Sequence, residues 1–348
     1  MDYIPLDRDF IQTIEDFFFC VIGYVHPPNW IISYLKYVPS DSGKWKYGDQ
    51  GLKRMLPHYS AQAVINTFQF LEKDYPQYLF KDSYSDVVFS AVPLKFIKQF
   101  YSTQQKLKEI SMSANLDPLQ EKLKNLVTTL SKHAGVSLDA FGVTGSILLD
   151  IHNPDFSDLD ITVHGKENSS KLRRTMKNIF EKGHPNLLPL NEIEAERWQK
   201  DKSERFGMSR DDAAELFKRK WNMGMFRDTR FSIHPIRNPE EIDEKYGDKT
   251  FVRKGQIEIQ AKLKDSEALF LPAKFEISDV DILNGENVEN IREIISYEGL
   301  FDAAVEEGEK VKAKGELELV INNINGKQHY QIVIGSKAGR LGEYILKI

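Results

Sequence analysis

An alternation of carboxylate and aliphatic residues, Asp158-Leu159-Asp160-Ile161, constrains the fold of this chain more than any other stretch. Period-two alternation in a β-branched context predicts a strand, and residues two apart on a strand point to the same face. Asp158 and Asp160 are therefore expected side by side, with Leu159 and Ile161 in the core. Two carboxylates this close repel each other strongly in a low-dielectric site. Such a pair indicates a bound cation, and oxygen ligands suit Mg²⁺ or Mn²⁺.

The pair Gly145-Ser146 precedes the acidic strand and follows the short apolar run 141–143. Glycine allows close backbone approach, and Ser146 is predicted to cap a helix that begins at Ile147. Free N–H groups at a helix start, together with a hydroxyl, favour phosphate binding. A phosphate cradle followed by a metal-binding strand predicts a site for a nucleoside triphosphate.

These residues resemble the signature of the DNA polymerase beta-type nucleotidyltransferase superfamily, in which Gly-Gly or Gly-Ser precedes Asp-apolar-Asp-apolar. The wider chain is similar to a group of predicted nucleotidyltransferases of unassigned substrate. The shared phrases are DFIQTIEDFFFCVIGYVHPP, GVTGSILLDIHNPDFSDLDITVHG and FSIHPIRNP. The resemblance implies a metal-dependent transfer of a nucleoside monophosphate from an NTP to an acceptor hydroxyl, with release of pyrophosphate. Asp158 and Asp160 would hold Mg²⁺ or Mn²⁺, and Gly145 and Ser146 would bind the triphosphate.

The neighbouring strand departs from the pattern of that superfamily. Its members usually carry a third carboxylate there, and the matching position in the predicted strand 231–237 is Ser232. His234 lies two residues on and on the same face. Transfer needs a group that takes the acceptor proton, or a second metal that lowers its pKa. His234 is either that base or a structural residue before Pro235. Ser232 also motivates an alternative function, a catalytically weak or inactive module that binds nucleotide or nucleic acid.

Basic residues follow the acidic strand on two predicted helices, 169–182 and 209–221. In the second, Lys218 and Arg219 are predicted to neutralise the triphosphate or to contact a nucleic-acid backbone. A solvated helix face is the competing interpretation of both clusters. The expected partners are an NTP and, as one open alternative for the acceptor, RNA or another nucleic acid.

A second Asp-x-Asp, Asp279-Val280-Asp281, shows that the motif is weak by itself. No Gly-Ser pair precedes it, and it lies in a region of repeated short strands, so a strand end or turn is expected there. A glycosyltransferase that uses Asp-x-Asp to hold a sugar nucleotide on Mn²⁺ is a rival reading of Asp158 and Asp160. A purely structural protein is a further alternative.

The order of predicted elements indicates an α+β protein in three parts. An N-terminal β/α segment (1–115) precedes a mixed α/β nucleotidyltransferase core (116–239) and a small antiparallel β-barrel (240–348). A helix is predicted over 117–132, because Asp117-Pro118 is a helix-start signal. The segment 39–53 is predicted to be a loop, 92–101 a helix, and 301–307 a short helix.

Composition limits the class of protein. Of 348 residues, 41% are hydrophobic and 28% charged, which is ordinary for a globular chain. A net charge of -5 argues against a basic nucleic-acid coat. The single cysteine, Cys20, excludes an intramolecular disulfide and fits a reducing cytoplasm. The apolar run around it is too short to span a bilayer, so no membrane partner is expected. Oligomeric state is left open.

Overall fold

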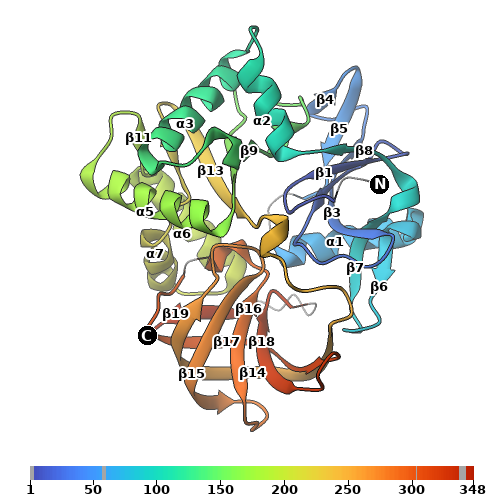
Figure 1. The fold of residues 1–348 in the computed structure, drawn as a ribbon, viewed down its shortest axis with the longest axis vertical. Coiled ribbons are helices and arrows are strands. Elements are labelled where there is room, and N and C mark those ends of the chain that lie inside the picture. The colour runs from blue at the N-terminus through green and yellow to red at the C-terminus, as the bar shows by residue number, and fades with distance from the viewer. Residues whose placement is uncertain (1–3, 57–59, 303, 337–341) are drawn as a thin grey trace.

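The protein folds into three sheets that use successive parts of the chain, and a computed structural model describes residues 4–56, 60–302, 304–336 and 342–348 (Figure 1). Helices pack mainly on the first two sheets, whereas the last sheet consists of long, strongly curved strands. The chain is therefore a mixed α/β protein. None of its described helices has the length and apolar character needed to cross a membrane.

The N-terminal sheet has the strand order β4-β5-β3-β2-β1-β8, and β6 and β7 extend it from β3. Its long central strand, β3, is almost wholly apolar, and its buried side chains form the core beneath helix α1. The elements are β1 (Phe10–Thr13), β2 (Phe18–Val21), β3 (Trp30–Pro39), β4 (Trp45–Tyr47), β5 (Gln50–Arg54), α1 (Ala61–Asp74), β6 (Leu79–Lys81), β7 (Val88–Pro93), β8 (Ile97–Tyr101) and α2 (Thr103–Met112).

Two predictions for this sheet are wrong. The segment 39–53 is not a loop but carries the hairpin β4–β5, which pairs with the end of β3. The segment 92–101 is not a helix: it contains the end of β7, a 3₁₀ turn (Leu94–Phe96) and β8. Its apolar spacing suits a helix locally, but β8 forms a ladder with β1, in which Tyr101 lies opposite Phe10. Long-range pairing therefore overrides the local pattern.

The central sheet has the order β11-β12-β13-β10-β9, and β10 and β13 are parallel neighbours. Leu159, Ile161 and Val163 alternate along β10 and are fully buried beneath the helices, as the period-two pattern predicts. The elements are α3 (Pro118–Ala134), β9 (Phe141–Val143), α4 (Gly145–Leu148), β10 (Leu159–His164), α5 (Lys166–Lys182), β11 (Leu187–Leu188), α6 (Glu192–Phe206), α7 (Arg210–Lys218), β12 (Met223–Phe226) and β13 (Thr229–Ile236).

Helix α3 begins at the predicted Asp117-Pro118 signal and ends at Ala134, two residues beyond the predicted range 117–132. The Asp117 side chain accepts hydrogen bonds from the backbone N–H groups of Leu119 and Gln120, and the Gln120 side chain completes a capping box. Pro118 takes the first helical position, where its missing N–H costs nothing. Gly135 ends the helix in the left-handed conformation that glycine adopts most easily. Local capping chemistry therefore fixes this element.

The C-terminal sheet curves into a half-barrel. Strand β14 pairs with both β15 and β17, so the path β14-β15-β16-β18-β17 returns to its first strand. The sheet is not wholly antiparallel as predicted, because β16 and β18 run parallel. The strands are β14 (Lys249–Ser266), β15 (Ala273–Asn284), β16 (Ile291–Ser296), β17 (Lys310–Asn322), β18 (Gln328–Ile334) and β19 (Tyr344–Lys347).

The short helix predicted over 301–307 is absent from the described part of that segment. A 3₁₀ turn, η5 (Gly299–Phe301), reaches only its first residue, the described residues after it form turns, and residue 303 lies outside the description. The second Asp-x-Asp is not at a strand end: Asp279 and Asp281 lie within β15, both exposed, and Asp279 has a φ of 51°.

Candidate functional site

The parallel pairing of β10 and β13 brings three polar side chains to one place. Asp160 lies opposite Ser232, and Thr162 lies opposite His234 in the same register. The Ser232 hydroxyl donates to Asp160 Oδ1 at 2.5 Å, and His234 Nε2 lies 2.8 Å from the Ser232 oxygen. Because the hydroxyl hydrogen points to Asp160, the imidazole donates that second bond. A neutral His234 then carries its lone pair on Nδ1.

The pKa values of Asp160 and His234 differ from those of exposed side chains. Burial alone would raise the pKa of Asp160, but hydrogen bonding and charge from His234, the Ser232 bond and Lys36 bring it to about 2. Burial, and next the charge of Arg8, lowers the pKa of His234 below its ordinary value. At neutral pH Asp160 is therefore ionised and His234 is neutral, so their charge pairing acts only in acid.

Gly145 lies against the Asp160 carboxylate. Its φ is 71°, and a Cβ atom at this position would be 2.6 Å from Asp160 Oδ2. Both the backbone conformation and the contact therefore require glycine. The Thr144 N–H also donates to the Asp160 carbonyl at 2.9 Å, which fixes this approach.

The helix after this glycine differs from the predicted one. Helix α4 begins at Gly145, not at Ile147, and spans only four residues. Its N-cap is Thr144, so Ser146 lies inside the turn and does not cap it. A single turn sums few peptide dipoles, which weakens the expected phosphate cradle. Triphosphate binding by Gly145 and Ser146 stays a prediction.

Asp158 lies immediately before β10 and is exposed, unlike Asp160. Desolvation, and next the charge of Asp160, raises the pKa of Asp158 to about 6, while Arg230 and Arg54 oppose the shift. The two carboxylates therefore influence each other, as the strand pattern predicts. Asp158 is the outer member of the pair.

A cavity of about 730 Å³ lies beside the inner carboxylate, and all three sheets contribute to its wall. Asp160, Ser232 and His234 line it, whereas Asp158, Gly145, Ser146, Lys218 and Arg219 are not among its lining residues. In Figure 1 the three sheets converge on the middle of the molecule. This volume is within the range of small-molecule sites.

Among the described residues, five cations line this cavity, Arg8, Lys36, Lys202, Lys220 and Arg253, and sequence reasoning did not connect Arg8 or Lys36 with the site. Lys36 is only 4% exposed, lies on β3, and its ammonium is 4.9 Å from the Phe10 ring centroid. Arg8 precedes β1 and has a φ of 72°, which is a rare conformation for a residue other than glycine. A lysine within the apolar run WIISYLKYV was the available signal, because buried lysines are rare.

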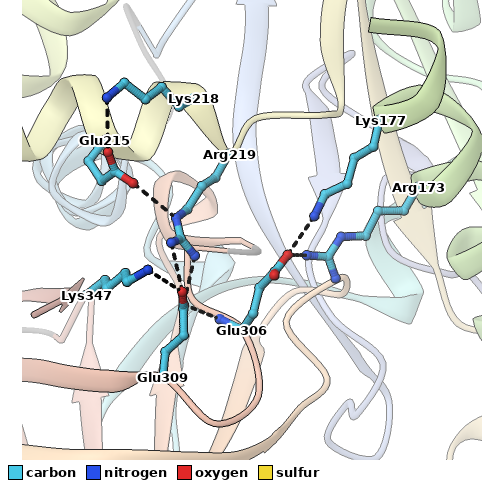
Figure 2. Close-up of polar contacts among 8 residues, drawn as sticks. All are labelled: Arg173, Lys177, Glu215, Lys218, Arg219, Glu306, Glu309 and Lys347. Atoms are coloured by element: carbon cyan, nitrogen blue, oxygen red, sulfur yellow. Dashed lines mark hydrogen bonds and ion pairs between the residues drawn. The ribbon is translucent and has the colours of Figure 1, made fainter. Parts of the chain in front are cut away.

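The predicted phosphate-binding cations Lys218 and Arg219 lie elsewhere, in an ion network with the C-terminal sheet (Figure 2). Arg219 donates two bonds to Glu309, at 2.8 and 2.9 Å, and Lys218 pairs with Glu215. The same network contains Arg173 and Lys177 from α5, both bound to Glu306. Here these cations neutralise protein carboxylates, and a role in triphosphate binding stays a prediction.

The donor set of the site bears on which metal ion could bind there. Within the described ranges, no three or more His, Cys, Asp or Glu side chains converge into a metal-binding group. Asp158 and Asp160 provide oxygen donors only, and Ser232 occupies the third position. Mg²⁺ usually keeps several waters and binds one or two carboxylates together with substrate phosphates. The donor set therefore fits Mg²⁺ bound with a nucleotide better than a cage made by the protein alone.

These features define a mixed α/β protein with a paired-carboxylate site at the junction of three sheets. The chain is 32% identical over 347 residues to the uncharacterized protein MJ1086 of Methanocaldococcus jannaschii, and the alignment covers 97% of each chain. It belongs to the same family as that archaeal protein. No family model matches the sequence, and no solved structure matches it significantly.

Proposed function

We propose that this protein is a nucleotidyltransferase of the DNA polymerase beta type, which moves a nucleoside monophosphate from an NTP to an acceptor hydroxyl. One observation carries the proposal: Asp160, Ser232 and His234 line a cavity that Arg8 and Lys36 of the N-terminal sheet also line. An acidic strand pair beside buried cations is suited to a ligand that carries both phosphate and a divalent ion.

The cations of the N-terminal sheet bind the phosphates. Lys36 and Arg8 act at close range, because burial strengthens their attraction for a phosphate oxygen. Both already affect the acidic site electrostatically: Lys36 lowers the pKa of Asp160, and Arg8 lowers the pKa of His234. Bound Mg²⁺ or Mn²⁺, held by Asp158 and Asp160 with phosphate oxygens, would further neutralise the negative charge.

The transfer itself exchanges one P–O bond for another. The acceptor oxygen attacks the α-phosphorus, the bond from that phosphorus to the oxygen bridging to the β-phosphate breaks, and pyrophosphate leaves with the electron pair. The acceptor proton passes to a base. Neutral His234 can accept it on Nδ1, while its Nε2 keeps the bond to Ser232. Ser232 and Asp160 thus orient the ring.

Ser232, at the position of the usual third carboxylate, favours a second candidate function, a binding module without catalysis. A hydroxyl stands there in place of a carboxylate, and it is bound to Asp160. Such a module would retain metal-dependent NTP binding without pyrophosphate release. Turnover with any acceptor would remove this candidate.

Calorimetric titration of ATP, GTP, CTP and UTP, with and without Mg²⁺, tests the proposal. Wild type is expected to bind at least one NTP with Mg²⁺, and Asp158→Ala/Asp160→Ala is expected to lose that binding. The matched control is Asp279→Ala/Asp281→Ala, which removes the exposed second motif and should bind as wild type does. A well-folded acidic-site variant that binds NTP normally would refute the proposal.

A further inference from the structure

Glu298 is a buried carboxylate in the cavity that the proposed chemistry does not use. It lies between β16 and η5, is 8% exposed and lines the cavity wall. Its Oε1 accepts the Ala61 N–H at 2.9 Å. No other residue in the described parts of the chain donates a hydrogen bond to this carboxylate or pairs with it as a cation. Among those residues Oε2 has no hydrogen-bond donor, and Lys202, which also lines the cavity, acts on the carboxylate through its charge.

Glu316 of the same sheet is also buried, but both of its carboxylate oxygens have hydrogen-bond partners. Glu316 is 7% exposed and does not line the cavity. Both of its oxygens are bound, Oε1 by the Gly255 N–H at 3.1 Å and Oε2 by Gln256 at 3.2 Å. A buried carboxylate without enough donors is costly. Burial accordingly raises the pKa of Glu298 to about 7.

The wall around Glu298 is apolar and aromatic. Val64 and Phe68 of α1 line the cavity, and the first N–H of that helix, from Ala61, binds Glu298. Phe89, Trp198 and Phe206 line the same cavity from β7 and α6. Aromatic walls suit a planar ring that can stack against them.

A short path through the protein joins Glu298 to the acidic site. Lys220, just before β12, donates to the carbonyl of Gly299, the residue after Glu298, at 3.1 Å. On β12 itself, Met223 lies opposite Ser232. Asp160 and Glu298 therefore line one cavity, together with Arg8 and Lys36 of the N-terminal sheet and the aromatic side chains of β7 and α6. A nucleotide with its phosphates beside Asp160 and its base beside Glu298 would occupy both places.

We propose that the NTP of the proposed function binds with its base against Glu298, and that this base is guanine. This inference rests on the proposed function and specifies its substrate. Guanine presents two adjacent donors, N1–H and the N2 amine, and the ionised Glu298 carboxylate accepts both without offering a donor of its own. Adenine and cytosine present an acceptor nitrogen next to their amine, and uracil flanks its single N–H with carbonyls, so each fits a carboxylate less well.

The test is titration of the full-length protein with GTP, ITP, XTP and ATP in the presence of Mg²⁺. ITP lacks the N2 amine, and XTP carries an oxygen in its place. Wild type is expected to bind GTP roughly tenfold or more tightly than ATP and XTP, with ITP between them, since hydrogen bonds to charged groups have about this value. This series needs no variant and is independent of folding effects.

Two variants test whether Glu298 causes the preference for guanine. Glu298→Gln keeps an oxygen for the Ala61 N–H and replaces the other with a donor, so it should weaken GTP roughly tenfold. The affinity for ATP should change by less, and the affinity for XTP should rise relative to that for GTP. Glu316→Gln, an equally buried change outside the cavity, should keep the wild-type order. Thermal unfolding confirms that both variants fold.

The outcomes separate the two proposals. Wild-type binding of all four nucleotides with equal affinity, or a GTP preference that persists in Glu298→Gln, would overturn the guanine inference and leave the proposed function standing. No binding of any NTP to the wild type would overturn both.

Discussion

Asp160 and Glu309 are both carboxylates near basic side chains, yet the protein satisfies them differently. Glu309 binds Arg219 through two bonds and Lys347 at 2.8 Å, and Glu306 beside it binds Arg173 and Lys177 (Figure 2). These ion pairs join the central helices to the C-terminal sheet. Asp160 instead accepts a bond from the neutral Ser232 hydroxyl and faces a cavity.

The difference is that Glu309 is satisfied by protein cations, whereas Asp160 faces space that a ligand can enter. Burial alone would raise the pKa of Glu309, but the bonds from Arg219 and Lys347 outweigh that effect and bring the pKa to about 2. In the cavity, Arg8 lies 3.5 Å from the Asp7 carboxylate, and Lys36 and Arg8 act on the acidic site through their charge. Substitutions in the two regions should therefore change different properties.

The largest expected effect is on activity, from Asp160→Asn. We expect nucleotidyl transfer, followed as pyrophosphate release, to fall roughly a thousandfold or more, because the residue acts as part of a unit. Asparagine keeps the shape and an acceptor for Ser232, so loss of the charge should cost about 1–3 kcal/mol of unfolding free energy in urea and leave the variant folded. A variant that is folded and fully active would contradict the assignment of Asp160.

The second effect concerns Gly145, which packs on Asp160. Gly145→Ala should cost about 1–2 kcal/mol for a left-handed residue and should also displace the Asp160 carboxylate. Gly135→Ala is the control, because Gly135 has a φ of 61° and open space around it. Only Gly145→Ala should weaken Mg²⁺-dependent NTP binding. Equal binding by the two variants would show that the contact with Asp160 is unimportant.

The third effect is on stability, from Glu309→Gln. The change should cost about 1–3 kcal/mol of unfolding free energy, because it removes charge-assisted bonds. A carboxylate with a depressed pKa stabilises the fold above its unfolded pKa and loses that contribution as pH falls. The wild-type advantage should therefore shrink between pH 4.5 and about 2. Urea titration across that range measures it, and NTP affinity at neutral pH should be unchanged.

The smallest effect is expected from a substitution in the second Asp-x-Asp motif, in the C-terminal sheet. Asp281→Asn alters an exposed carboxylate of β15 that shares its local sequence with Asp160. Stability should change by about 0.5 kcal/mol or less, and pyrophosphate release should match wild type. A loss of activity as large as that of Asp160→Asn would place the site in the C-terminal sheet.

The two Asp-x-Asp motifs show what sequence could establish. The peptides Ser-Asp-Leu-Asp-Ile and Ser-Asp-Val-Asp-Ile are nearly identical, and both lie on or beside strands. Gly145, and a neighbouring strand that carries Ser232 and His234, distinguish the first. The sequence predicted Gly145 and that strand, and the register sets Ser232 opposite Asp160. Helix α3 was equally predictable, because its caps are local.

Features that depend on distant pairing were not predictable. The apolar spacing of 92–101 favoured a helix, but residues 97–101 of this segment pair with β1 and form a strand. Arg8 and Lys36 reach the cavity from the N-terminal sheet and Glu298 from the C-terminal part, and no spacing in the sequence relates them to Asp160. Their signal is a charge within an otherwise buried stretch, which indicates an unusual environment without naming the partner.

The Thr144 hydroxyl donates to the carbonyl of Arg8 at 2.8 Å, across a separation of 136 positions. This bond joins the first strands of the chain to the turn that leads into the acidic strand. During synthesis the strands that carry Arg8 and Lys36 emerge well before any carboxylate of the central sheet. The site can therefore be completed only late in synthesis. Its cations Arg8 and Lys36 are translated first, and its carboxylates Asp160 and Glu298 follow.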